Sequence, residues 1–201
     1  MTGICENRTV IITGAGGGLG RAHALEFASE GANVIVNDIN AETAQAVVDE
    51  IVAAGGVAMA NTFDITDYAA CTAAVQDAVA NYGDLHVVVN NAGVNRDRMF
   101  ASMTEQEWDT IMAVHLKGHF CLSSNAVQYW RGKVKSGEAV SGRIINTSSG
   151  AGLQGSIGQS NYAAAKAGIA ALTLNQAAEL GRYGITANAI TPAARTAMTD
   201  R

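Results

Sequence analysis

The sequence predicts an α/β fold, a doubly wound parallel sheet in one domain. Short apolar runs alternate with longer helical patterns along the chain. The run Leu85–Val89 lacks polar alternation, as expected for a strand covered on both faces. Glycine supplies 22 of the 201 residues and proline one, which is typical of tight turns. Strands that alternate with helices form a parallel sheet with right-handed crossovers and helices on both faces.

The expected elements follow one another in a regular order. We expect strands at Thr9–Thr13, Asn33–Asn37, Val57–Asn61, Leu85–Val89, Arg143–Asn146 and Ile185–Ile190. We expect helices at Leu19–Ser29, Ala41–Ala54, Asp67–Asn81, Thr104–Arg131 and Asn161–Leu180. Lys133–Gly142 is expected to be a polar loop. No linker or repeat divides the chain, so residues 1–201 are expected to form a single domain.

The composition argues against several classes of protein. The net charge is −5 and no run of Lys or Arg occurs, so we expect neither nucleic acid nor a membrane as a partner. No apolar stretch is long enough to span a bilayer. Cys5, Cys71 and Cys121 are widely spaced, which fits neither a disulfide framework nor a metal site. We therefore expect free thiols, no metal and a cytoplasmic location.

A glycine-rich turn follows the first expected strand and opens the first helix. Such a turn lets backbone N–H groups and the positive end of a helix dipole approach a pyrophosphate closely. We therefore expect Gly14, Gly18, Leu19 and Gly20 to bind a dinucleotide. The alternative is a flexible glycine loop, which the flanking strand and helix disfavour.

Two acidic residues follow the next two strands. Asp38 is placed to accept hydrogen bonds from the adenosine ribose hydroxyls, or it is a turn residue at a strand end. A carboxylate there repels a 2′-phosphate, and neighbouring Gly17 and Ile39 are not basic, so we expect NAD rather than NADP. For Asp64 two roles fit equally: acceptor for the adenine amino group, or turn and cap residue.

Small residues follow the fourth strand. Asn91, Ala92 and Gly93 lie at the carboxyl edge, where ligands bind in open α/β sheets. Small side chains there allow a cofactor to lie close to the backbone. We expect these three residues to line the cofactor site, although an isolated tetrapeptide of this kind also fits a plain turn.

Tyr162 and Lys166 are four positions apart, on one face of an expected helix. A phenol is a poor base at neutral pH, but a nearby ammonium favours the phenolate. Tyr162 is thus a candidate proton acceptor for an alcohol that loses hydride. Ser149, at the end of the fifth strand, is a candidate to hold the substrate oxygen. The alternative is an ordinary exposed pair on a helix.

In this order and combination the residues resemble the short-chain dehydrogenase/reductase family, from about residue 8 to the end. The resemblance implies a Rossmann-type sheet with NAD(P) at its carboxyl edge and the roles given above for Ser149, Tyr162 and Lys166. It also implies that Lys166 binds the nicotinamide ribose and that Thr196 touches the carboxamide. Segments such as Asn95–Met99 are similar to (3R)-hydroxyacyl-CoA dehydrogenases and bacterial 3-oxoacyl-acyl-carrier-protein reductases.

The sequence departs from the family pattern in three places. His115 stands where many members have an asparagine of a proton relay, so it is either part of the site or a packed core histidine. Ala193, not glycine, follows Pro192. Members also continue beyond the position of Arg201 with a substrate-covering lid and a last strand, so we expect an open substrate side. The resemblance implies a homodimer or homotetramer.

Three functions follow as hypotheses. The first is NAD-linked hydride transfer on a 3-hydroxyacyl or 3-oxoacyl thioester. The second is the same chemistry on a steroid, sugar or other carbonyl, since one scaffold hosts many substrates. The third is a dinucleotide-binding protein without catalysis, to which His115 and Ala193 lend support.

Overall fold

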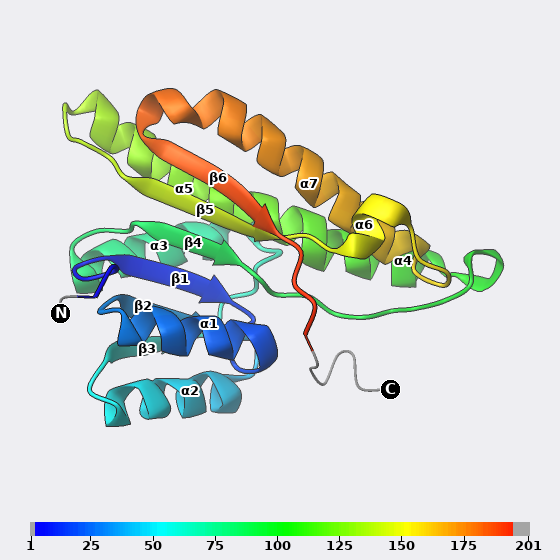
Figure 1. Cartoon of the computed structure of the whole chain (residues 1–201), viewed down its shortest axis with the longest axis horizontal. Helices are drawn as coiled ribbons and strands as arrows, with labels where there is room; N and C mark the ends of the chain where they lie inside the picture. Colours follow the sequence, from blue (N-terminus) through cyan, green and yellow to red (C-terminus); the bar gives the residue numbers. More distant parts are fainter. Residues whose placement is uncertain (1–2, 195–201) are drawn as a thin grey trace.

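The computed structural model describes residues 3–194, and in that part of the chain all strands lie in one parallel sheet (Figure 1). The strand order is β3-β2-β1-β4-β5-β6, with the order reversing between β1 and β4. The predicted fold class is confirmed. The strands are β1 (Thr9–Thr13), β2 (Asn33–Asn37), β3 (Val57–Asn61), β4 (Val87–Asn90), β5 (Gly142–Thr147) and β6 (Ile185–Ile190).

Helices cover the sheet in two layers (Figure 1). On one face lie α1 and α2, and on the other α3, α5 and α7. The α-helices of the described residues are α1 (Gly18–Ser29), α2 (Ala41–Ala53), α3 (Tyr68–Tyr82), α4 (Glu105–Ile111), α5 (Gly118–Lys135), α6 (Gly150–Gln154) and α7 (Ser160–Leu180). Short 3-10 turns lie at Phe100–Ser102 and Gly181–Tyr183.

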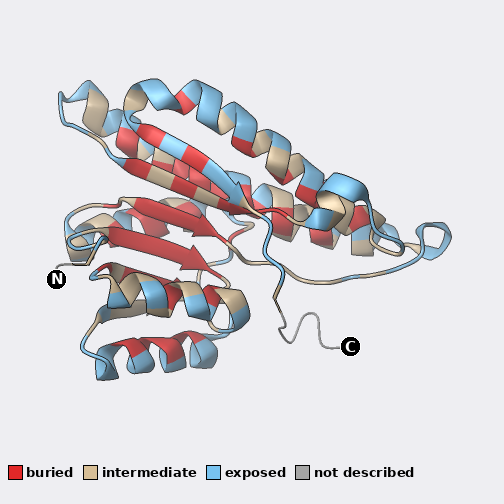
Figure 2. Cartoon of the chain, viewed as in Figure 1, coloured by how far each residue is buried: buried red, intermediate tan, exposed pale blue. Residues whose placement is uncertain are grey.

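The core forms because successive side chains of a strand point to opposite faces. On β1, Val10 and Ile12 pack with α1 and α2, whereas Ile11 packs with α3 and α5. Both faces of β1 are fully buried, as its apolar run predicts. In β6 buried and exposed residues alternate instead, so one of its faces is open among the described residues (Figure 2).

The predicted helix Thr104–Arg131 is wrong in detail. A capping box between Thr104 and Glu107 starts α4, but a π-helical turn at Met112–Lys117 separates α4 from α5. That turn holds one residue more than α-helical periodicity allows, and the sequence carries no simple signal for it. The end of the helix is also later than predicted, at Lys135, and α6 was not predicted at all.

Within the chain α7 buries one face, which includes Asn161, Ala165, Lys166 and Ile169, while Leu174 on another face is exposed. Among residues 3–194 no helix combines the length and apolar character needed to cross a membrane.

Candidate active site

A cavity of about 380 Å³ opens at the carboxyl ends of β1, β2, β4 and β5. This edge is where open parallel sheets bind ligands, at the point where the strand order reverses. The cavity brings together most residues predicted for the site, from segments far apart in sequence. Its lining includes Gly14, Gly18, Leu19, Asp38, Asn91, Ala92, Gly93, His115, Ser149, Tyr162 and Lys166.

The glycine-rich turn has the shape that its composition predicts. Gly14 and Gly18 have positive φ angles of 62° and 52°, a region that L side chains rarely adopt. A Cβ on Gly20 would lie 2.1 Å from the Gly14 carbonyl oxygen, so Gly20 is needed for packing and does not itself line the cavity. Gly17 precedes α1 and faces open space, which leaves the first N–H groups of the helix accessible.

The turn after β4 holds the glycine turn in place. The Asn91 side-chain amide donates to the carbonyl oxygens of Thr13 (3.0 Å) and Gly14 (3.2 Å). The backbone N–H groups of Asn91 and Ala92 donate to the Thr13 hydroxyl. Asn91 therefore orders the backbone at the cavity while also lining it.

Asp38 is fixed at the cavity wall by backbone hydrogen bonds. Gly16 N–H donates to its Oδ2 and Asn40 N–H to its Oδ1, each at 3.0 Å. Asp64 does not line this cavity but an adjoining one of about 270 Å³ that shares Asp38. Its Oδ1 accepts hydrogen bonds from the backbone N–H and the hydroxyl of Thr66. These bonds correspond to the turn role, one of the two alternatives given for Asp64 from the sequence.

Ser149 caps α6, since its hydroxyl accepts from Ala151 N–H at 3.2 Å. It also hydrogen-bonds the Tyr162 phenol, an interaction that lowers the pKa of Tyr162. The effect of burial on the pKa is larger than that of Ser149, however. Together with the charge of Asp97, burial raises the pKa of Tyr162 above its usual value. The pair has the arrangement needed to hold a substrate oxygen next to a phenol proton.

Lys166 is buried beneath Tyr162. Its Nζ lies 5.5 Å from the centre of the Tyr162 ring and donates to the Thr147 carbonyl at 2.6 Å. Burial lowers the pKa of Lys166 to about 8. The expected lowering of the Tyr162 pKa by Lys166 is not seen, because the ammonium is held by Thr147 and burial of the phenol dominates.

His115 lies in the π turn, and its ring stands edge-on to Tyr162 with the ring centres 5.2 Å apart. Its Nε2 contacts both the N–H (3.1 Å) and the carbonyl (2.8 Å) of Val94. Burial, and secondly the charge of Lys166, lower the pKa of His115 to about 4, so the imidazole is neutral. Both sequence alternatives hold in part: the ring is packed, and it lines the cavity.

The chemical groups that line the cavity suit a dinucleotide. Two buried polar atoms, Thr147 Oγ1 and His115 Nδ1, have no hydrogen-bond partner in the described residues, and both residues line the cavity. Buried polar atoms usually have partners, so a polar ligand is a natural occupant. A glycine turn at one end and a carboxylate at the wall match a pyrophosphate and a ribose.

Sequence reasoning missed several lining residues. Thr147 and Ser148 join Ser149 at the cavity, and Pro192 and Ala194 close another side. The run of small polar residues directly after a buried strand was the signal that could have found the first two. Thr196, predicted to touch the carboxamide, lies outside the described residues.

Comparisons with known proteins agree with this geometry. Hydroxyacyl-CoA dehydrogenase ChsB1 of Mycobacterium tuberculosis is 54% identical over 201 residues, covering 96% of this chain and 63% of its own. The 3-oxoacyl-acyl-carrier-protein reductase FabG of Staphylococcus aureus is 42% identical over 187 residues, covering 92% of this chain and 73% of its own. A crystal structure of a short chain dehydrogenase from Mycobacterium avium superposes with a TM-score of 0.95 at 58% identity, over 99% of this chain and 72% of that one.

The chain thus spans somewhat less than two thirds of the ChsB1 sequence that it matches. In the peroxisomal hydratase-dehydrogenase-epimerase of Saccharomyces cerevisiae, 44% identical over 204 residues, it spans 22%. The profile of the short chain dehydrogenase family matches residues 8–201. With this match, the parallel sheet and the cavity at its carboxyl edge, the chain belongs to the short chain dehydrogenase family.

Proposed function

We propose that this protein transfers hydride between a secondary alcohol and a ketone with NAD(H), and that its substrate is a 3-hydroxyacyl or 3-oxoacyl thioester. The observation that carries the proposal is the meeting of Ser149, Tyr162 and Lys166 in one cavity with the glycine turn. The names of two relatives, a hydroxyacyl-CoA dehydrogenase and a 3-oxoacyl-acyl-carrier-protein reductase, favour the thioester.

The bound nicotinamide supplies the hydride chemistry, and the chain's own residues handle the proton. In the direction of oxidation Tyr162 takes the alcohol proton through its phenolate, and in reduction its phenol returns the proton to the carbonyl oxygen. The Ser149 hydroxyl holds the same substrate oxygen next to the phenol. Lys166, whose ammonium lies 5.5 Å from the centre of the Tyr162 ring, is assigned to the ribose hydroxyls of the cofactor.

On the cofactor side the proposal assigns the phosphates to Gly14, Gly18, Leu19 and the start of α1. Gly20, Asn91, Ala92 and Gly93 support or line that surface. Asp64 lines the adjoining cavity, and the proposal gives its second carboxylate oxygen the role of acceptor for the adenine amino group.

The activity is tested with the full-length protein, NAD and a series of 3-hydroxyacyl-CoA substrates of increasing chain length, followed by the absorbance of NADH. We expect turnover with at least one chain length. Absence of turnover across the series would sink the thioester assignment. A panel of steroid, sugar and simple ketones with NADH then separates the thioester from the second hypothesis.

The preference for NAD over NADP rests on Asp38. Its carboxylate is fixed by Gly16 and Asn40 at the cavity wall, where a 2′-phosphate would meet a like charge. We expect NADH to bind at least about tenfold more tightly than NADPH, a difference of ~1.4 kcal/mol. Titration of intrinsic fluorescence with both nucleotides measures it, and tighter binding of NADPH would overturn the preference.

We further propose a homodimer or homotetramer in the cytoplasm. Exposed apolar side chains on neighbouring helices support self-association: Trp108 on α4, Phe120 on α5 and Leu174 on α7. Light scattering coupled to size exclusion measures the mass, and a monomer at micromolar concentration contradicts the proposal. Cell fractionation checks the location.

A further inference from the structure

His119 is a buried polar side chain to which the proposed chemistry gives no role. It lies in the first turn of α5, one helical turn after His115, and is 1% exposed. A buried imidazole is costly unless its nitrogens have partners. The positions of those partners connect His119 to the catalytic lysine.

Thr147, the last residue of β5, is held from both sides of its backbone. Its N–H donates to His119 Nε2 at 3.3 Å, and its carbonyl accepts from Lys166 Nζ at 2.6 Å. The His119 ring also makes backbone hydrogen bonds with His115 and with Asn90 at the end of β4. His119 therefore joins the ends of two strands and the π turn to the residue that anchors Lys166.

The charge state of His119 is fixed by its surroundings. Burial first, then the charge of Lys166 and the neighbouring His115, lower the pKa of His119 well below its usual value. A neutral ring that accepts at Nε2 carries its proton on Nδ1, from which it donates to a backbone carbonyl. The ring is thus a fixed, uncharged acceptor, suited to hold the peptide between Asn146 and Thr147 in one orientation.

We propose that His119 is a positioning residue for Lys166: by holding the N–H of Thr147 it restrains the backbone of the residue whose carbonyl holds the lysine ammonium beside Tyr162. The catalytic importance of Lys166 rests on the proposed function, whereas the anchoring of its ammonium by Thr147 rests on geometry alone. Among the described residues, the titratable groups that face Lys166 are Tyr162 on α7, His115 in the π turn and His119 itself, while β4 and β5 present backbone atoms.

The test compares three variants. His119→Leu removes the acceptor for Thr147 N–H, so the backbone at Thr147 is held only on its carbonyl side, where Ser148 N–H donates to Ile190. The carbonyl that stabilises the ammonium is then less firmly placed, and the pKa of Lys166 falls further. His119→Gln keeps an oxygen acceptor of similar reach. Thr173→Val, the control, removes the buried hydroxyl that accepts from Asn146 at 2.9 Å, away from Lys166. His119→Asn, too short to reach Thr147, replaces the leucine variant if that one does not fold.

The measurements are the titration of the Lys166 ammonium by 15N NMR, assigned with Lys166→Met, and kcat with its pH profile. For His119→Leu we expect the Lys166 titration to move down by about 0.5 pH unit or more and kcat to fall about tenfold. His119→Gln should restore both, and Thr173→Val should lower the melting temperature alone. An unmoved Lys166 titration in His119→Leu overturns the proposal whatever the activity. If no protein turns over any alcohol, the proposed function fails, and the NMR titration still decides the role of His119.

Discussion

The two halves of the sheet build their parts of the site by different means. On the side of β1, β2 and β3 the cavity is shaped by backbone: glycines with positive φ, the open start of α1 and the backbone-bound Asp38. On the side of β4, β5 and β6 its wall includes the buried polar side chains His115, Thr147, Ser148 and Lys166. Behind this wall lie further buried polar side chains, among them Asn90, His119, Ser123, Asn146, Asn161 and Thr173.

The polar half is held together by a hydrogen-bonded network. Asn90 donates to Ser123 (2.8 Å) and Asn146 (2.9 Å), and Asn146 donates in turn to Thr173. Such a network fixes side chains that must keep one orientation, but each member depends on the others. The half of the sheet around β1, β2 and β3, the backbone half, therefore depends on glycine at positions such as Gly14 and Gly20, where a Cβ would meet backbone atoms. In the polar half the activity depends on the side chains that line the cavity.

The largest expected effect is on chemistry in the polar half. Tyr162→Phe removes the proton donor but keeps the ring against His115 and Lys166. We expect kcat to fall by about 10²–10⁴-fold, the usual contribution of a positioned acid or base, with NAD affinity nearly unchanged. Steady-state kinetics and nucleotide titration measure the two. A variant that keeps more than a tenth of the activity would remove Tyr162 from the mechanism.

The next effect is on the backbone half. Gly20→Ala places a Cβ 2.1 Å from the Gly14 carbonyl oxygen, so the turn has to shift. We expect about 3 kcal/mol of lost stability and weaker NAD binding. Gly132→Ala on α5 is the matched control, since its Cβ meets nothing within 4 Å. The control should gain about 0.5–1 kcal/mol in a denaturant titration, and equal effects of the two substitutions would contradict the packing argument.

A third effect appears in acid. The pKa of His115 is lowered to about 4 in the fold and returns to about 6.5 on unfolding. Below pH 6.5 the unfolded chain binds a proton that the folded one does not, so stability falls as the pH drops from 6.5 to 4. We expect His115→Asn to remove about 2–3 kcal/mol of this loss near pH 4. Urea titrations of both proteins at pH 7 and pH 4 measure it, and parallel losses would contradict burial of a neutral imidazole.

The smallest effect concerns the cost of keeping Lys166 buried. Its pKa is lowered to about 8, so below pH 8 the fold bears a buried charge, and stability rises as the pH increases from 8 to 10.5. We expect Lys166→Met to be inactive and yet about 1–2 kcal/mol more stable at pH 7. This gain is smaller than the pKa shift of Lys166 implies, because the Thr147 carbonyl loses its hydrogen-bond donor. The gain should diminish by pH 10.5. A less stable variant at pH 7 would show that the hydrogen bond outweighs burial of the charge.

The same contrast explains what the sequence could predict. The backbone half leaves a local pattern, because positive φ and close approach demand glycine at fixed places, as at Gly14, Gly18 and Gly20. Tyr162 and Lys166 were predictable as a pair one helical turn apart. The anchoring of Lys166 by Thr147, and of Thr147 by His119, could not be predicted. Those residues are far apart in sequence and meet only because β4 and β5 pair in parallel, with a helical crossover between them.

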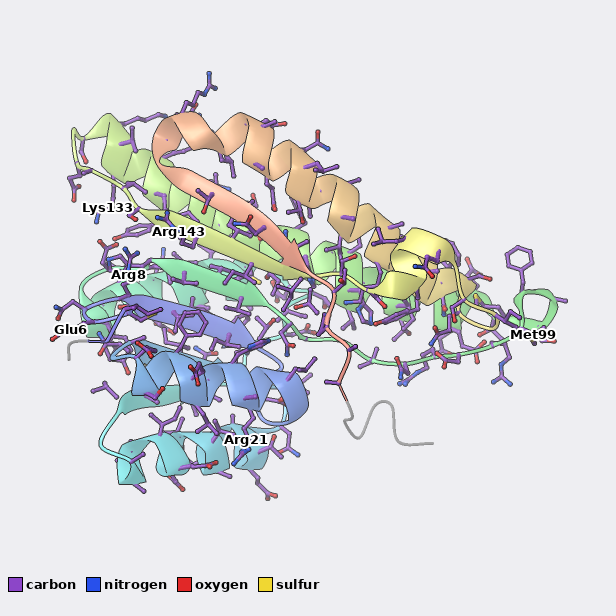
Figure 3. All side chains as sticks on the ribbon, in the orientation of Figure 1. Glu6, Arg8, Arg21, Met99, Lys133 and Arg143 are labelled. Carbon is purple, nitrogen blue, oxygen red and sulfur yellow. The ribbon has the colours of Figure 1, made fainter. Side chains whose placement is uncertain are left out.

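The loop after β4 shows another limit of sequence reasoning. Arg98 pairs with Glu107 at 2.8 Å, and its backbone N–H donates to the Gly158 carbonyl at 2.7 Å. These segments lie beyond the carboxyl edge of the sheet, where Met99 marks the projecting loop (Figure 3). The backbone contact between Arg98 and Gly158 joins residues more than fifty positions apart, so no local sequence pattern predicts it.

The π turn at Met112–Lys117 has a consequence for how the protein tolerates insertions and deletions. Each residue of an α-helix advances the face by about 100°. Deleting one residue from the turn would restore α-helical periodicity and leave α4 and α5 with nearly the same faces toward the core, because the extra residue is contained in the turn. Ile111 would stay buried, whereas residues of the turn, among them His115 beside Tyr162, would change direction. A single-codon deletion here should therefore harm the site more than the fold, and one inside α5, which rotates the rest of that helix by about 100°, should be more harmful to the fold.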